Sequence, residues 1–284
     1  MFKTVQPLLW AFDAEWAPDP AAGRVLYKLP ADMPDAEVVV EMWRRGGATE
    51  EDPTPFLKTV LCRVVSIAAL QRKVKGGQVE LSLLWLPRDV SDPAQLPEEN
   101  VISTFLNALG KHRPQLVGFN SHGADLKILV QRAVVKGLAA PEFCRRPEKP
   151  WEGTDYFSRG SESNIDLLEI LGSWGKNGLS LNEVASLSGI PGKFEAEGEL
   201  VPKMWLTGRW REIVEYNCFD ALTTYLVWLR MAHFAGHLNR TQYDEEQGLL
   251  RDAIMEWTEK PELAFLERYL EEWDRLQEAT GQSG

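Results

Sequence analysis

Near the start of the chain, an aspartate and a glutamate stand two residues apart directly after an apolar stretch. Residues 5–12 read VQPLLWAF and predict a buried β-strand, and Asp13 and Glu15 follow it. Residues i and i+2 of a strand share one face, so both carboxylates would point to the same place. The same spacing recurs from Asp35 and from Asp244, in a Pro-containing loop and in an acidic tail, where solvated carboxylates are expected. Only the first pair therefore has the placement that two ligands of one metal site require.

A second carboxylate begins a helix in the middle of the chain. Residues 116–135 predict a short strand, a turn that contains Asn120, and an amphipathic helix with Asp125 in its first turn. A carboxylate in the first turn of a helix also complements the helix dipole. From this segment alone, a structural role and a metal-binding role of Asp125 are equally open.

Tyr216 and Asp220 lie on one face of a predicted helix. Residues 210–231 are rich in apolar side chains, and positions i and i+4 of a helix are neighbours. An aspartate in so apolar a helix is costly to bury without a partner, and a metal ion is a suitable one. The alternative is a partly exposed Asp220 on a solvated stripe. If the carboxylates of all three segments converge, they predict two divalent cations, because a folded chain rarely tolerates such a cluster otherwise.

The three segments FDAEW, FNSHGAD and YNCFD resemble the three exonuclease motifs of the DEDD superfamily of 3′→5′ exonucleases, in its tyrosine-containing branch. The chain is most similar to small bacterial proteins related to the proofreading domain of family B DNA polymerases. The similarity includes NIDLLEILGSWG and LSLNEVASLSGIPGK and covers most of residues 5–232. Two positions distinguish the chain within the superfamily: Ala124 stands where an aromatic residue is usual, and Glu215 stands where the histidine branch has its histidine.

The resemblance implies a ribonuclease H-like three-layer α/β fold with a mixed central sheet. It also implies two divalent ions, Mg²⁺ or Mn²⁺, with Asp13 shared between them, Glu15 and Asp220 completing the first site, and Asp125 holding the second ion. Tyr216 has an ordinary pKa of about 10, so we expect it to orient the attacking water rather than to deprotonate it. Asn120 would lie beside the 3′-terminal nucleotide.

The implied activity is metal-dependent 3′→5′ hydrolysis of single-stranded or frayed DNA or RNA ends, with release of nucleoside 5′-monophosphates. A competing hypothesis is a non-catalytic nucleic-acid-binding or protein-interaction module that retains the fold. A further alternative is an endonuclease of the same broad fold, which would also cut a circular single strand.

The remaining patterns predict an exonuclease domain over residues 1–236 with two insertions. Residues 61–70 and 79–87 predict a strand hairpin around Gly76 and Gly77, and residues 101–112 predict a helix. We expect the first insertion, near residues 17–60, to form a surface loop or an added hairpin. The second insertion, near residues 141–163, interleaves basic and aromatic side chains, which suits a single strand.

Within the second insertion, Arg145 and Arg146 are the candidate phosphate contacts, beside Trp151, Tyr156 and Phe157. The alternative is a solvated loop whose aromatic side chains pack back on the core. Trp16, one residue after Glu15, is a further candidate for stacking on a nucleobase.

Residues 237–284 predict an acidic helical extension with two apolar stripes. Its apolar stripes would pack on the core, or alternatively dock on a separate protein partner. The extension holds twelve Asp/Glu and five Lys/Arg, so it carries most of the formal net charge of −11. Residues 1–236 are then close to neutral once metal ions bind the four carboxylates. This charge predicts modest affinity for nucleic acid and a substrate held mainly at its 3′ end.

The sequence also limits the cell compartments in which we expect the protein. No run approaches the roughly 20 apolar residues that a membrane helix needs, and the N-terminal residues lack the plan of a signal peptide. The three cysteines are far apart in the sequence and form no metal-like pair. We therefore expect a cytoplasmic protein with reduced thiols and no membrane contact.

Overall fold

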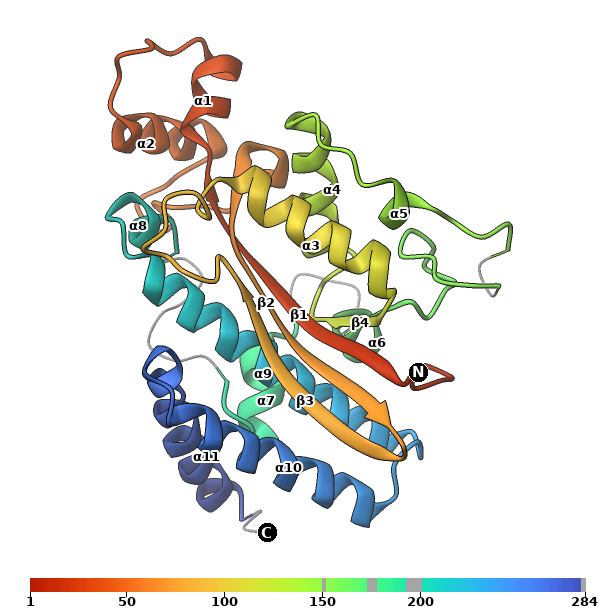
Figure 1. Cartoon of the computed structure of the whole chain (residues 1–284). Helices are drawn as coiled ribbons and strands as arrows, with labels where there is room; N and C mark the ends of the chain where they lie inside the picture. The colour runs from red at the N-terminus through yellow and green to blue at the C-terminus, as the bar shows by residue number, and fades with distance from the viewer. Residues whose placement is uncertain (150–151, 173–177, 193–200, 282–284) are drawn as a thin grey trace.

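A mixed five-stranded sheet forms the centre of the protein (Figure 1). The computed structural model describes residues 1–149, 152–172, 178–192 and 201–281. The strands are β1 (Leu8–Pro18), β2 (Cys62–Lys75), β3 (Gln78–Leu86), β4 (Gln115–Gly118) and β5 (Asn164–Asp166), in the spatial order β3-β2-β1-β4-β5. Strands β1 to β3 are antiparallel, whereas β4 and β5 run parallel to β1. This is the mixed sheet of the ribonuclease H-like fold, so the predicted fold class is confirmed.

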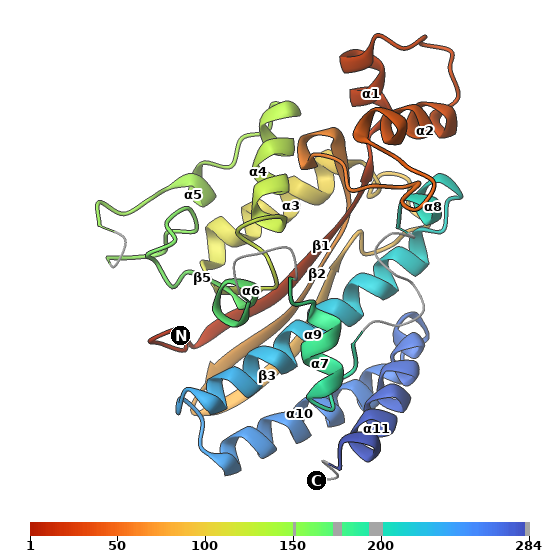
Figure 2. The ribbon, with the colours of Figure 1, turned by 180° about the vertical axis from the view of Figure 1, so that it is seen from behind.

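Helices cover both faces of this sheet (Figure 2). The elements between the strands are α1 (Pro20–Tyr27), α2 (Asp35–Gly46), the 3-10 turn η1 (Thr59–Leu61), α3 (Glu98–His112), α4 (Asp125–Val135) and α5 (Pro141–Cys144). After β5 follow α6 (Leu167–Leu171), α7 (Leu181–Leu187), α8 (Val201–Leu206), α9 (Trp210–Phe234), α10 (Arg240–Thr258), the 3-10 turn η3 (Pro261–Leu266) and α11 (Glu267–Thr280). Among the described residues, no helix is both long and apolar enough to cross a membrane.

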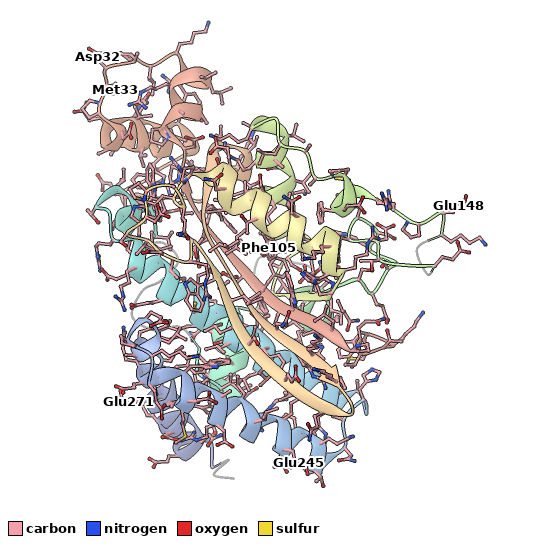
Figure 3. All side chains as sticks on the ribbon, in the orientation of Figure 1. Asp32, Met33, Phe105, Glu148, Glu245 and Glu271 are labelled. Atoms are coloured by element: carbon pink, nitrogen blue, oxygen red, sulfur yellow. The ribbon has the colours of Figure 1, made fainter. Side chains whose placement is uncertain are left out.

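Alternate residues of β1 enter two different cores. Leu9 and Ala11 pack in the core beneath α9, whereas Trp10 and Phe12 pack in the core beneath α3 and α4. Phe105 of α3, labelled in Figure 3, belongs to the second core and lies with its ring centroid 5.6 Å from that of Phe12. Because side chains alternate along a strand, odd-numbered residues after Ala11 continue on the α9 side. This alternation decides on which face the acidic residues of β1 lie.

β1 is longer than the apolar run that predicted it. It continues through Asp13 and Glu15 to Pro18, because the antiparallel neighbour β2 pairs with it along this whole length. The register changes between Glu15 and Trp16, where Glu15 pairs with Ser66 and Trp16 with Val64. The predicted β2–β3 hairpin is present, with Gly76 and Gly77 between its strands.

The first insertion does not form the expected loop or hairpin. Residues 20–46 form two packed helices, α1 and α2, which stand together at one end of the sheet in Figures 1 and 2. The expectation was wrong because the Pro and charged residues that suggested a loop are helix-end signals here. Asp19 caps α1 ahead of Pro20, and α2 begins with Asp35 and ends with Arg44 and Arg45, charges that complement its dipole.

The C-terminal helical extension is present and packs on the core through a buried ionic network. Glu246 of α10 accepts two hydrogen bonds from the Arg72 guanidinium of β2, at 2.5 and 2.9 Å, and a third from the Tyr225 hydroxyl of α9. Arg72 and Glu246 are each only 5% exposed. The expectation that Glu246 is a solvated tail carboxylate was therefore wrong. Other acidic residues of the extension, such as Glu245 and Glu271 in Figure 3, do point outward.

Candidate active site

Three of the predicted carboxylates meet on the α9 side of the sheet. Asp13 and Glu15 lie on β1, and Asp220 lies near the middle of α9, which packs against β1 and β2. One carboxylate oxygen from each residue lies within 4.8 Å of the corresponding oxygens of the other two. The structure therefore brings together Asp13, Glu15 and Asp220, as the alternation of β1 and the placement of Asp220 on α9 require.

Asp125 adjoins this trio from the other side of β1. It is the first residue of α4, and its Oδ1 accepts a hydrogen bond of 3.1 Å from the amide of Ala14. Ala14 is the residue between Asp13 and Glu15, so this bond fixes the fourth carboxylate next to the first two. Asp125 is 3% exposed.

The four carboxylates disfavour one another's charge. Burial raises the pKa of Asp13 well above its ordinary value, and the charges of Asp125, Glu15 and Asp220 raise it further. Burial likewise raises the pKa of Asp125 to about 7, although backbone hydrogen bonds from Ala14 and from its own amide oppose the shift. Without a cation, part of the cluster therefore keeps its protons near neutral pH. A divalent ion would remove this repulsion.

Tyr216 lies one helical turn before Asp220 on α9 and is 5% exposed. Its ring packs with Ala17, Val65 and residues of α8 in a small core next to the carboxylates. Burial raises the pKa of its hydroxyl, and the charges of Asp220, Glu15 and Asp13 raise it further. The hydroxyl consequently stays protonated and is suited to donate a hydrogen bond, not to accept a proton.

Asn217 is a site residue that the sequence reasoning missed. Its Nδ2 donates a 2.7 Å hydrogen bond to Oδ2 of Asp13, and its Oδ1 accepts a 2.9 Å bond from the Ser66 hydroxyl. Asn217 is fully buried. The available signal was an amide next to Tyr216 in an otherwise apolar helix, because such a side chain needs buried partners.

The turn between β4 and α4 is held by Asp166, at the end of β5. The Asp166 carboxylate accepts the amides of Asn120 and His122, both at 2.9 Å, and also caps α6. Asp166 therefore serves both as the cap of α6 and as the acceptor of the two turn amides. Asn120 has a φ of 67°, and a Cβ on Gly123 would lie 2.3 Å from Asn120 Oδ1, so a side chain at position 123 would displace the Asn120 amide group. Asp166 thus fixes the turn that delivers Asp125.

A cavity of about 190 Å³ opens beside Asp13 and Glu15. It is lined further by Ala14, Trp16, Pro18, Cys62 and Pro202, and by Trp43, Thr54, Pro55, Phe56 and Leu57 of the first insertion. Trp16, the candidate for base stacking, therefore lies at the cavity next to the carboxylates. These residues of the first insertion are five of the twelve that line the cavity.

Arg145 and Arg146 lie elsewhere, in the segment after α5, which Figures 1 and 2 show on the opposite side of the molecule from α8. Arg145 pairs with Glu142 at 2.6 Å, and Arg146 pairs with the buried Asp155 at 3.0 Å. Neither lines the cavity beside Asp13.

The two described aromatic candidates of this second insertion differ in burial. Tyr156 is buried, and its hydroxyl donates to the carbonyl of Pro114. Phe157 is exposed, although its ring lies 5.2 Å from that of Phe143 in the same insertion. Trp151 lies outside the described residues. The packing of Tyr156 corresponds to the alternative in which the insertion covers the core.

The donor set at Asp13, Glu15, Asp125 and Asp220 fits hard divalent cations. All four residues offer carboxylate oxygens, the ligand type that Mg²⁺ and Mn²⁺ prefer. Burial and acidic neighbours raise the pKa of Asp13, and a bound cation would oppose this effect. Asp13, Glu15 and Asp220 have the spacing to hold one ion, and Asp125 lies beside them.

A second group of potential ligand atoms lies where the turn before α4 meets the start of α6. Atoms of His122, Asp166 and Glu169 also lie within 4.8 Å of one another, with His122 Nδ1 3.1 Å from Glu169 Oε2. The Asp166 oxygens here already accept backbone amides. We therefore interpret this group as a set of polar contacts that stabilises the turn.

The structure thus defines an α/β protein with converging carboxylates that have the composition of a divalent-cation site. Residues 54–273 match the family described as a predicted 3′-5′ exonuclease related to the exonuclease domain of PolB, and the chain belongs to this family. Asp125, Tyr216 and Asp220 lie inside the matched range, whereas Asp13 and Glu15 precede it.

Comparison with solved structures returns the family B DNA polymerase of the hyperthermophilic archaeon Pyrobaculum calidifontis among its matches. The match has 16% sequence identity and a TM-score of 0.48, and it covers 82% of this chain and 25% of the polymerase. The chain thus spans about a quarter of the polymerase's length. No curated protein matches the chain in sequence.

Proposed function

We propose that this protein is a metal-dependent 3′→5′ exonuclease of the tyrosine-containing DEDD branch, acting on single-stranded or frayed ends. The observation that carries the proposal is the convergence of Asp13, Glu15 and Asp220 within 4.8 Å, with Asp125 tied to the strand between them. Membership of the predicted exonuclease family supports the reaction class. The proposed substrates are the 3′ ends of DNA or RNA strands.

The reaction is hydrolysis of the terminal phosphodiester. Water attacks phosphorus, the bond to the 3′ oxygen of the preceding nucleotide breaks, and a nucleoside 5′-monophosphate leaves. Two divalent ions, Mg²⁺ or Mn²⁺, would make the water more acidic and compensate charge on the phosphate and on the departing oxygen. Asp13, Glu15, Asp125 and Asp220 hold these ions in the proposal.

Other residues position the reactants and the ligands. The protonated Tyr216 hydroxyl donates a hydrogen bond that orients the attacking water. Asn217 fixes the rotamer of Asp13 through its 2.7 Å bond, and Ser66 fixes Asn217. Asn120, on the turn held by Asp166, faces the 3′-terminal nucleotide in this proposal.

The proposal is tested with matched 5′-labelled single strands of DNA and RNA, incubated with Mg²⁺, Mn²⁺ or EDTA. We expect a ladder that shortens from the 3′ end, that EDTA abolishes, and that Asp13→Asn and Asp220→Asn also abolish. Asp252→Asn, at an exposed position in α10, serves as the matched carboxylate control and should cleave normally.

Two results would contradict the proposal. Absence of cleavage under every metal condition would favour the non-catalytic binding module. Cleavage of a circular single strand would favour the endonuclease, since an exonuclease needs an end.

A further inference from the structure

The α1–α2 pair, together with the segment that follows it to residue 58, is one packed unit, here called the lobe. Val38, Val39 and Met42 of α2 are completely buried. The outer tip of the lobe, with Asp32 and Met33, stands clear of the sheet in Figure 3. The lobe thus has its own small core, although it is an insertion in the fold.

Both ends of the lobe are fixed to the nuclease core. Asp19, the cap of α1, accepts a 2.5 Å hydrogen bond from the fully buried Arg132 of α4, and Arg132 also pairs with Glu98 of α3 at 2.7 Å. The amide of Asp19 donates to the carbonyl of Leu61 at the other end of the insertion. These hydrogen bonds and ion pairs hold the lobe in a fixed position relative to the carboxylates.

The returning segment of the lobe, residues 54–57, lies over the cavity beside Asp13 and Glu15. The end of α2 supports it, because a Cβ on Gly46 would lie 2.5 Å from Cδ2 of Leu57. Phe56 lines the cavity and is nevertheless 81% exposed. An exposed Phe side chain forfeits burial free energy, and a bound apolar ring would recover part of it.

The rest of the wall is also apolar and aromatic. Trp16 and Trp43 line it, while Thr54 and Cys62 are the polar exceptions apart from Asp13 and Glu15. A volume of about 190 Å³ is smaller than the roughly 300–1,000 Å³ of pockets for drug-sized ligands, so it admits one ring system rather than an oligonucleotide. Aromatic side chains stack on any nucleobase, because every base has a π-face.

We propose that the lobe forms the binding site of the 3′-terminal nucleobase, with Phe56 as its stacking residue. The inference rests on the proposed exonuclease function, because the adjoining carboxylates would hold the scissile phosphate. Lys58 directly follows the lining residue Leu57 and is exposed, without an ion-pair partner among the described residues, so in this proposal it contacts a neighbouring phosphate. The mostly apolar wall contacts the base by stacking and shape, so the four bases bind with similar affinity. A strand whose last residue lacks a base loses this contact.

The test compares two single-stranded oligonucleotides that differ only in the last residue, a normal nucleotide or an abasic one. Phe56→Ala should raise KM for the normal strand by about 5- to 150-fold, the range that loss of one stacked base produces. It should leave KM for the abasic strand unchanged and kcat nearly unchanged. Phe56→Trp should restore the normal KM.

Phe234→Ala is the matched control, because Phe234 is 80% exposed and ends α9 away from the lobe. Since Phe56 is exposed, the truncation should not lower Tm. Equal KM values of wild type and Phe56→Ala, or an equal rise on both strands, would overturn the inference and leave the exonuclease intact. Failure of the wild-type protein to shorten either strand would instead overturn the proposed function.

Discussion

Replacing Asp125 by Asn should stabilise the metal-free protein at neutral and alkaline pH, although it damages the proposed active site. Asp125 is buried, and burial raises the pKa of its carboxyl from 3.8 to about 7, with Asp166 and Asp220 adding repulsion. The unfolded chain lacks these effects. Asn has nearly the same shape, carries no charge, and keeps an oxygen that can accept the amide of Ala14.

The size and sign of the effect follow from proton linkage. Below pH 3.8 the carboxyl is protonated in both states, so it costs nothing. Between pH 3.8 and about 7 the unfolded chain loses the proton and the folded protein keeps it, so the free energy of unfolding falls as the pH rises. About three pKa units at 1.36 kcal/mol each give a penalty of up to about 4 kcal/mol, complete above pH 7. Asp125→Asn removes this penalty.

The assay is thermal and urea unfolding of wild type, Asp125→Asn and the exposed control Asp52→Asn, in EDTA from pH 4 to 8. At pH 8 the Asp125→Asn protein should melt several degrees above wild type, and the curves should converge near pH 4. Mn²⁺ should raise the Tm of wild type more than that of the variant, since ligand binding stabilises the folded state. If Asp125→Asn were less stable than wild type in EDTA at pH 8, the inferred charge repulsion would be refuted.

Three further perturbations probe the site and its supports. Glu246→Ala leaves Arg72 buried without its partner and should lower the free energy of unfolding by about 3–5 kcal/mol. The control Glu271→Ala, at an exposed position of α11, should change it little; urea titration measures both. Asp166→Ala removes the acceptor of two turn amides. It should lower kcat at least about tenfold and the free energy of unfolding by about 1–3 kcal/mol. An unchanged kcat would show that the turn holds Asp125 in place without Asp166. Tyr216→Phe should lower kcat about 10²-fold yet preserve the Mn²⁺-induced rise in Tm, and loss of that rise would make Tyr216 a determinant of metal binding instead.

The strands β1 to β4 were predictable because their signals are local. The apolar run before Asp13, the Gly76-Gly77 turn and the apolar periodicity of α9 each describe one segment and its neighbours. Once Asp13 and Glu15 share a strand face and Asp220 lies within α9, packing of α9 on β1 brings them together. β5 has only three residues and was not predicted. The layered arrangement with a mixed sheet came from resemblance to a known family rather than from periodicity.

The partners of the buried polar groups were not predictable, because they lie far apart in the sequence. Arg72 and Glu246 are separated by 174 positions, and Asn217 and Asp13 by 204. Each of these residues alone resembles a solvated polar residue, and only the fold shows that it is buried. The helices of the first insertion were missed for a local reason, since Pro and charged residues occur both in loops and at helix ends.

The alternation of β1 connects the core to the proposed chemistry. Leu9 and Ala11 are buried on the α9 side of the sheet. The same alternation of side chains places Asp13 and Glu15 on that side, next to Asp220. A shift of one residue would turn Trp10 and Phe12 toward α9 and the carboxylates toward α3 and α4. The hydrophobic residues of β1 therefore set the register of the acidic ones. The same strand carries Trp16 to the cavity that the lobe completes, so one strand positions both the proposed metal ligands and a wall of the proposed base site.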